Sequence, residues 1–248
     1  MIILKTEREI GIIRSNGVIL AQTLKLIGER ITPGIRTAEL DELAEEYIRS
    51  QSALPAFKGY RGYPANICVS IDNEIVHGIP GNRIIKEGQI ISVDIGVLKD
   101  GYYADAAYTY AAGKISPEKE KLLSVTKSAL EKGVEMAIAG NHLGDISYSI
   151  QSLAEENSFS VVRDLVGHGI GMNMHEEPQI PNFGNLGQGI VLKEGMVLAI
   201  EPMINTGGFE IETLKDNWTV VTKDGSVSAH FEHTVAVGKS GPHILTSL

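Results

Sequence analysis

The stretch KEGQIISVD at residues 86–94 has an echo in KEGMVLAIE at residues 193–201. Each copy starts with Lys-Glu-Gly, continues as an apolar run typical of a buried strand, and reaches a carboxylate eight residues after the lysine. Asp94 and Glu201 therefore occupy matching positions. Because three letters before a strand can also recur by chance, the sequence around each copy decides whether the chain contains a duplication.

Two helix signals precede the first copy. Thr6 and Glu9 form a capping-box pair, and apolar residues then recur at helical spacing as far as Ile27. Thr37 is suited to cap a second helix, whose apolar stripe continues to Ile48. Strand-like runs follow as ICVSI at residues 67–71 and IISVDIGVL at residues 90–98.

A similar helix pair precedes the second copy. Ser116 and Pro117 predict the start of a third helix that runs to about Ala139, and a fourth helix is predicted from Ile146 to Leu153. Strand-like runs return at SVVRDLV (160–166), GMVLAIEP (195–202), WTVVT (218–222) and HFEHTVAV (230–237).

The repeated order, two helices and then strands, favours duplication over chance. It predicts an α+β fold with two similar halves, about residues 1–112 and 113–248, that face each other around a central site. No low-complexity linker separates the halves, so we expect a single domain over residues 1–248.

Composition limits the classes of function. A net charge of −9 and a pI of about 5.3, with no cluster of basic residues, argue against a nucleic-acid partner. The N-terminal residues lack the apolar core of a secretory signal, and no apolar run reaches the length of a membrane span. The single cysteine, Cys68, excludes a framework of intrachain disulfides and fits a reducing compartment. We therefore expect a cytoplasmic protein with no membrane partner.

Two carboxylates are expected on one face of a hairpin. Asp94 lies in an apolar strand, and the dipeptide Asp100-Gly101 that follows is a strong signal for a two-residue turn. With that turn Asp94 pairs with Ala107, which puts Asp105 on the same face, roughly 7–8 Å away along the diagonal. A three-residue loop would shift the register and remove this relation.

Two further acids, Glu201 and Glu232, interrupt strands that otherwise look buried. A lone acid in a strand usually faces solvent or pairs with a basic residue. Four carboxylates gathered with Asp94 and Asp105 could not all stay ionised without compensation, and two divalent cations would supply it. His168 would add one nitrogen donor, a set that suits manganese, iron or cobalt, with zinc as a further candidate. The sequence thus predicts a dinuclear hydrolytic centre.

Five segments resemble, in order and spacing, the motifs of type I methionine aminopeptidases. They are NICVSIDNEIVHGIP (66–80), VDIGVLKDGYYAD (93–105), GHGIGMNMHEEPQIPN (167–182), EGMVLAIEP (194–202) and SAHFEHTV (228–235). The likeness covers almost the whole chain and matches the short bacterial form, which has no N-terminal zinc-binding extension. It implies the pseudo-symmetric pita-bread fold. It also implies a monomer that removes the initiator methionine from nascent chains near the ribosome, with preference for a small second residue.

The resemblance also implies the metal ligands. One ion would be chelated by Asp94 and the other by His168 and Glu201, with Asp105 and Glu232 bridging the two. From the placement of charge, Glu201 is also the candidate to move the proton during hydrolysis, although it would ligate a metal as well.

Substrate contacts follow from the resemblance as well. His77 and His175 would contact the scissile peptide, with His175 at its carbonyl. The methionine side chain would enter a pocket formed by Phe57, Tyr60, Tyr63, Cys68, His77, Met174 and Trp218, although a mixed aromatic core explains these residues equally well. No role is implied for His142, His230, His233 and His243.

Two positions depart from the family pattern. Ala106 follows Asp105 where a hydroxyl residue is common, which would remove a hydrogen bond to the site. Phe57 stands where some members have cysteine, so the resemblance does not determine how wide the pocket is.

Two alternative functions share the fold. A proline-specific peptidase such as prolidase or aminopeptidase P would carry an additional N-terminal domain, for which the first predicted helix, starting near Thr6, leaves no room. A non-catalytic peptide-binding module would have lost its metal ligands, whereas all five positions are filled here.

Overall fold

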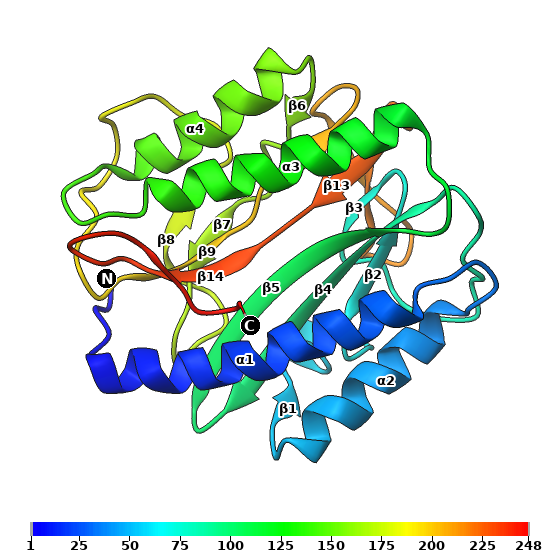
Figure 1. Ribbon diagram of the computed structural model, residues 1–248, viewed down its shortest axis with the longest axis horizontal. Coiled ribbons are helices and arrows are strands. Elements are labelled where there is room, and N and C mark those ends of the chain that lie inside the picture. The colour runs from blue at the N-terminus through cyan, green and yellow to red at the C-terminus, as the bar shows by residue number, and fades with distance from the viewer. Residues whose placement is uncertain (1, 248) are drawn as a thin grey trace.

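The structure, a computed structural model, describes residues 2–247 and contains two pairs of helices with strands between them (Figure 1). The helices are α1 (Glu7–Arg30), α2 (Thr37–Ser50), η1 (Tyr60–Gly62, a 3-10 helix), α3 (Pro117–Glu135) and α4 (Leu143–Glu156). The strands of the first half are β1 (Leu54–Pro55), β2 (Cys68–Ile71), β3 (Glu74–Val76), β4 (Ile90–Lys99) and β5 (Tyr102–Ala111). Those of the second half are β6 (Ser160–Val161), β7 (Gly167–Gly169), β8 (Glu176–Ile180), β9 (Val197–Ile200), β10 (Met203–Asn205), β11 (Ile211–Thr213), β12 (Val220–Thr222), β13 (Ser228–His230), β14 (His233–Ala236) and β15 (His243–Ile244).

The strands of residues 2–247 form four small sheets. One has the order β1-β4-β2 with β5 also paired to β4, and another has the order β15-β14-β9-β7-β8. The remaining two are β13-β10-β6 and β11-β12-β3, and the latter joins strands from both halves. This mixture of helices and largely antiparallel strands is the predicted α+β class.

The Lys-Glu-Gly echo forms the same turn in both halves. Gly88 and Gly195 adopt φ angles of +82° and +86°, left-handed values that glycine reaches without strain. The next residue, Gln89 or Met196, donates its backbone N–H to the carbonyl of the lysine, at 3.3 Å and 3.1 Å respectively. Each turn leads into an antiparallel strand pair, β4 with β5 and β9 with β14, so the two matched carboxylates lie at equivalent places.

The hairpin predicted around Asp100-Gly101 is confirmed. Both turn residues have positive φ, 52° and 78°, as a two-residue turn with this dipeptide requires. The register pairs Asp94 with Ala107 and places Asp105 opposite Gly96. The relation between the two aspartates therefore follows from a local turn signal.

Helix starts were predicted well at two positions and wrongly at one. Thr6 and Ser116 are the N-caps of α1 and α3, and Thr6 forms its capping box. Thr37, however, is the first helical residue of α2, and Arg36 is the N-cap. The Thr37 hydroxyl is engaged elsewhere, since it donates to the carbonyl of Gly81 at 3.1 Å and accepts from the Gly81 N–H at 2.9 Å.

Two other predicted elements are shorter in the structure. Helix α3 ends at Glu135 rather than near Ala139, because Ala139 donates its backbone N–H to the carbonyl of Gly238 at 3.0 Å. The strand predicted over residues 160–166 is reduced to β6. A tertiary contact ends the helix and a short pairing partner limits the strand, so neither element extends as far as its sequence pattern predicts.

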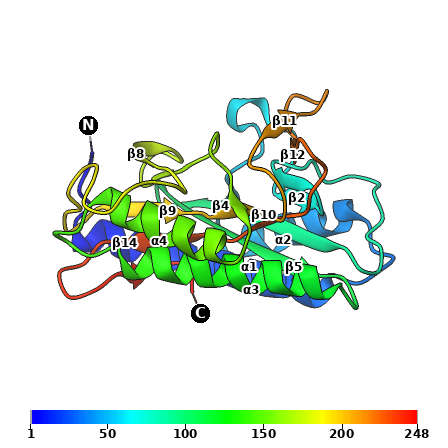
Figure 2. The same cartoon turned by 90° about the horizontal axis from the view of Figure 1, so that it is seen from above.

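Each helix pair packs on the strands of its own half. One core cluster joins α1 and α2 to β2, β4 and β5, and a second joins α3 and α4 to β9 and β14. Figure 2 shows α1 and α3 along one side of the strands and β8, β11 and β12 on the opposite side. The longest strands are thus held from one side by helices.

Helix α1 is long and apolar enough to cross a membrane by length and composition alone. Its apolar face is buried in the protein, with Ile13 and Leu20 fully inaccessible. The side-chain amide of Asn16 donates to the carbonyls of Lys99 and Tyr102, at 3.0 Å and 2.9 Å. Helix α1 is therefore hydrophobic because it packs in the core of the protein, where Asn16 contacts the turn between β4 and β5.

Candidate metal centre

Two breaks in facing strands carry Glu201 and Glu232. Strand β9 ends before Glu201 and resumes as β10 after Pro202, while β13 ends after His230 and resumes as β14 at His233. Because β9 pairs with β14 and β10 pairs with β13, the two breaks lie opposite each other. The sequence predicts continuous strands through both positions. In the structure both strands are interrupted at the two glutamates, which lie outside the paired segments. The backbone N–H of Glu232 instead donates to the carbonyl of Ala107 on β5, at 2.9 Å.

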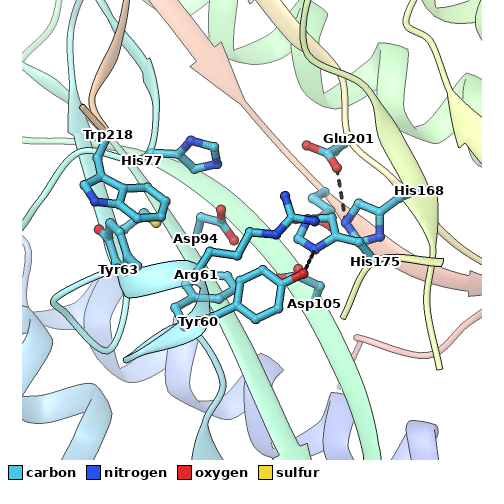
Figure 3. Close-up of a pocket in the computed structure, with 13 residues that line it drawn as sticks. Tyr60, Arg61, Tyr63, His77, Asp94, Asp105, His168, His175, Glu201 and Trp218 are labelled. Atoms are coloured by element: carbon cyan, nitrogen blue, oxygen red, sulfur yellow. Dashed lines mark hydrogen bonds and ion pairs between the residues drawn. The ribbon is translucent and has the colours of Figure 1, made fainter. Parts of the chain in front are cut away.

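The acidic side chains meet in the interior. Asp94 on β4 and Asp105 on β5 extend towards the breaks (Figure 3), and Asp105 and Glu232 are only 5% and 2% exposed. One carboxylate oxygen of Asp94, of Asp105 and of Glu232 is buried with no hydrogen-bond partner among the described residues. Buried acceptors without donors are costly, so the cluster is incomplete as it stands.

Burial governs the protonation of the four acids. Loss of solvation raises the pKa of Asp94 and that of Glu201 to about 7. The same cause, with repulsion from the neighbouring carboxylates, raises the pKa of Asp105 and Glu232 well above the usual range. In the absence of positive charge the cluster therefore holds protons near neutral pH.

His168 is oriented as a nitrogen ligand. It lies on β7 and is 7% exposed. Its Nδ1 is 2.9 Å from the carbonyl oxygen of Gly169, which can only accept, so Nδ1 carries the proton. The lone pair is left on Nε2, 3.6 Å from Oε1 of Glu201. One ligand atom each of Asp105, His168 and Glu232 lie within 4.8 Å of one another.

The donor set fits divalent cations. One imidazole nitrogen and several carboxylate oxygens, all buried and lacking proton donors, are the ligands that manganese, iron and cobalt accept. Cations would also remove the repulsion that raises the pKa values of the acids. The residues present therefore suit the metal centre predicted from the sequence.

A cavity of about 140 Å³ opens beside the cluster. It is lined by Phe57, Tyr60, Arg61, Tyr63, Cys68, His77, Asp94, Asp105, His168, His175, Glu201, Trp218 and Glu232. Its apolar end contains Tyr63 and Cys68, packed with Phe57 and Trp218. Every residue predicted for the site lines this cavity except Met174, which is 1% exposed and lies behind Gly96.

The two predicted substrate histidines are neutral at pH 7. Burial lowers the pKa of His175 to about 3 and that of His77 to about 4. Nδ1 of His175 lies 2.8 Å from the hydroxyl of Tyr60 (Figure 3). When this hydroxyl donates to Nδ1, the single ring proton of His175 is on Nε2 and is available as a hydrogen-bond donor.

Comparison with known proteins agrees with this chemistry. The family model of metallopeptidase family M24 matches residues 11–239. The chain belongs to metallopeptidase family M24. Within M24 it is 53% identical to methionine aminopeptidase of Clostridium perfringens and 53% identical to methionine aminopeptidase 1 of Bacillus subtilis, each over 99% of both chains. The resemblance to methionine aminopeptidases drawn from the five motifs is confirmed.

Two solved structures show the same fold. The crystal structure of methionine aminopeptidase from Rickettsia prowazekii superposes with a TM-score of 0.98 at 43% identity, covering 99% of this chain and all of that one. Prolidase from Pyrococcus furiosus gives a TM-score of 0.79 at 23% identity, and the match covers only 66% of its chain. The predicted pita-bread fold is confirmed, and the prolidase likeness is one of fold alone.

No role was predicted for His230, which lies beside Glu201 in the acidic cluster. It is 1% exposed, neither ring nitrogen has a partner among the described residues, and Nε2 is 3.6 Å from Oε2 of Glu201. His230 on β13 pairs with Met203, two residues after Glu201, just as Asp105 on β5 pairs with Gly96, two residues after Asp94. Strand alternation could have indicated it, since residues two apart share a face and His230 is two before Glu232.

Metal binding to this M24 site is expected to release protons. Because burial raises the pKa of Asp94 and Glu201 to about 7, protons occupy the cluster below that pH and a cation must displace them. The apparent affinity for Mn²⁺ should therefore rise with pH between pH 6 and 8. Calorimetric titration in two buffers of different ionisation enthalpy counts the released protons. Glu232→Gln should release fewer, and a pH-independent affinity without proton release would contradict the expectation.

Proposed function

We propose that this protein is a metal-dependent aminopeptidase that removes the N-terminal methionine from peptides and nascent proteins, with preference for a small second residue. One observation carries the proposal: a buried cluster of acids and histidine adjoins a small apolar cavity. Full-length identity of 53% to methionine aminopeptidases supports the same conclusion.

The metal centre is proposed to hold two divalent ions, cobalt, manganese or iron, with zinc as a further candidate. Asp94 would serve one ion, His168 and Glu201 the other, and Asp105 and Glu232 both. The ligands come from both halves of the chain, which supports a single catalytic domain. Bound divalent cations lower the pKa of water from about 15.7 towards 7 and so supply a nucleophile at neutral pH.

Glu201 is proposed to move the proton. Its carboxylate would accept the proton of the attacking water and deliver it to the amine of the departing peptide. The carboxylate of Glu201 lies between the rings of His168 and His230, whose Nε2 atoms are each 3.6 Å from one of its oxygens.

His175 is proposed to stabilise the carbonyl oxygen of the scissile bond as it becomes negative. A neutral imidazole with its proton on Nε2 is a fixed hydrogen-bond donor, and Tyr60 holds the ring by its other nitrogen. His77, at the opposite wall beside Trp218, would contact the peptide from the other side. His77 has a φ of +60°, a strained value for a residue with a side chain, as is often found at functional sites.

The apolar end of the cavity would receive the methionine side chain. Tyr63 and Trp218 lie edge to face with ring centroids 5.1 Å apart, and aromatic edges make favourable contacts with a thioether sulfur. Burial raises the pKa of the Cys68 thiol, so this wall stays uncharged. Phe57 and Tyr60 would complete the pocket, whereas the buried Met174 would act only by supporting its wall.

A peptide panel tests the function. We expect Met-Ala-Ser to be cleaved with a kcat/KM at least about tenfold above those of Met-Leu-Ser and Leu-Ala-Ser, since the site would be filled by the first side chain and would leave little room for the second. Formyl-Met-Ala-Ser should resist cleavage, because formylation removes the basic amine that the acidic cluster would hold. Comparable kcat/KM values for all four would contradict the proposal. Faster cleavage of Met-Pro-Ser or Leu-Pro-Ser than of Met-Ala-Ser would favour a proline-specific peptidase.

The cellular setting is part of the proposal. The single cysteine fits a reducing compartment such as the cytoplasm, where we propose that the protein acts. We propose that the protein works as a monomer on nascent chains near the ribosome, as the family resemblance implies.

A further inference from the structure

The loop between β1 and β2 has an unusual backbone where it passes the cavity. Three of its four residues from 59 to 62 have positive φ: Gly59 at 85°, Arg61 at 49° and Gly62 at 90°. Glycine adopts such angles freely, but arginine does so at a cost in free energy. The loop is nevertheless well defined, since the N–H groups of Gly59 and Tyr63 donate to the carbonyls of Tyr63 and Tyr60, at 2.8 Å and 2.9 Å. A strained non-glycine residue held by its surroundings suggests a functional constraint.

The side chain of Arg61 lines the cavity. Its guanidinium carbon lies 5.4 Å from the centre of the Tyr60 ring, and the side chain extends across the cavity towards His175 (Figure 3). Among residues 2–247, no carboxylate or carbonyl forms an ion pair or hydrogen bond with this guanidinium. Lys58 in the same loop differs, because it does not line the cavity and its Nζ is 3.5 Å from Glu45.

The position of Arg61 relative to a substrate follows from the proposed function, on which this inference rests. The first side chain would occupy the end formed by Tyr63 and Trp218, and the scissile carbonyl would lie at His175. The rest of the peptide must then leave past the exposed loop that carries Arg61. The planar guanidinium presents paired donors that match a carboxylate.

We infer that Arg61 is a specificity-determining residue that binds a carboxylate of the substrate beyond the cleaved bond. In a short peptide this group can be the terminal carboxylate, and in a longer chain it can be an acidic side chain at the third residue. Such an arginine would offset the repulsion that the net charge of −9 exerts on an acidic substrate.

Matched peptides isolate this effect. Met-Ala-Glu-amide and Met-Ala-Gln-amide differ in one side-chain charge, and Met-Ala-Ser and its amide differ in the terminal carboxylate. For the unsubstituted protein at low salt we expect kcat/KM to be about three- to fivefold higher for the charged member of a pair, through KM. The preference should shrink as salt is added. A preference within the Met-Ala-Glu-amide pair would mean that Arg61 binds an acidic side chain, and a preference within the Met-Ala-Ser pair would mean that it binds the terminal carboxylate.

Variants complete the experiment. For each peptide pair that shows a preference, Arg61→Gln should bring the ratio of the two kcat/KM values close to one. Lys58→Gln removes an equal charge from the same loop and should leave these ratios unchanged. Arg61→Gly is a second variant that keeps the loop, since glycine adopts positive φ without strain, and it should lose the preference without a fall in Tm. Comparing ratios cancels any general loss of rate caused by disturbing His175.

The outcomes separate this inference from the proposed function. If no peptide with N-terminal methionine is cleaved, the proposed function fails. If Met-Ala-Gln-amide is cleaved but no charged peptide is preferred, or if the preference survives in Arg61→Gln and Arg61→Gly, the role of Arg61 is wrong and the proposed function stands. Equal loss of preference in Lys58→Gln would also overturn it, because it would indicate a general charge effect.

Discussion

Glu232→Gln is expected to lower kcat/KM for Met-Ala-Ser by at least ~10³-fold while the protein stays folded. The substitution keeps the shape of the side chain and removes one negative charge from the centre of the acidic cluster. Glu232 is 2% exposed, has a carboxylate oxygen without a partner among the described residues, and offers a ligand atom within 4.8 Å of those of Asp105 and His168. Rates measured at fixed Mn²⁺ concentration, with metal content determined for each sample, check the expectation.

Glu232→Gln should lower activity, but it should also reduce the stability that the metal-free protein loses as pH rises. Burial and neighbouring charges raise the pKa of Glu232 above its unfolded value of 4.5, so the folded state binds more protons than the unfolded state as pH rises through that value. Stability contributed by this group is therefore present below pH 4.5 and is lost as pH rises towards neutrality. The Tm of metal-free Glu232→Gln should fall less between pH 5 and 7 than that of the unsubstituted protein.

Glu212→Gln is a matched control, because Glu212 lies exposed on β11 and its side chain makes no hydrogen bond or ion pair among the described residues. It should change neither the rate nor the pH dependence of Tm. Near-normal turnover of Glu232→Gln at low metal content would show that the cluster is not the reaction centre.

Features set by local chemistry were predictable from the sequence. The capping box at Thr6, the proline after Ser116 and the positive-φ turn at Asp100-Gly101 each depend on a few neighbouring residues. The turn determines the register of β4 and β5, and in this register Asp94 pairs with Ala107. In this way one dipeptide indicated that two of the predicted ligands belong together.

Features set by long-range pairing were not predictable in the same way. The breaks at Glu201 and Glu232 arise because two paired strands are interrupted opposite each other, and neither segment alone contains that information. The end of α3 depends on a hydrogen bond to Gly238, far along the chain. The position of Arg61 depends on a backbone angle that its own side chain disfavours. Sequence patterns therefore predicted the ligand types, and tertiary structure determined what surrounds the predicted ligands.

His175→Ala is expected to lower kcat by roughly 10²–10³-fold while leaving the affinity for Mn²⁺ close to normal, the scale of losing one donor to a developing oxyanion. The rings of His175 and His168 are only 4.2 Å apart between centroids, so proximity alone does not separate their roles. Their hydrogen bonds do, because the Nδ1 proton of His168 is committed to the carbonyl of Gly169, which leaves its Nε2 lone pair towards the acids. His175 is instead bonded to Tyr60, outside the cluster.

His168→Ala should therefore weaken Mn²⁺ binding, and its activity should be partly restored by raising the metal concentration. Added metal should not restore His175→Ala. Tyr60→Phe removes the hydroxyl that holds His175 and should lower kcat by about tenfold without changing metal affinity. His243→Ala, at an exposed position on β15, is the control for loss of an imidazole. Calorimetry of all four variants, with kcat and KM measured at saturating metal, decides between the two roles. Equal loss of metal affinity in His168→Ala and His175→Ala would mean that both rings are ligands, and the oxyanion donor would then have to be sought at His77.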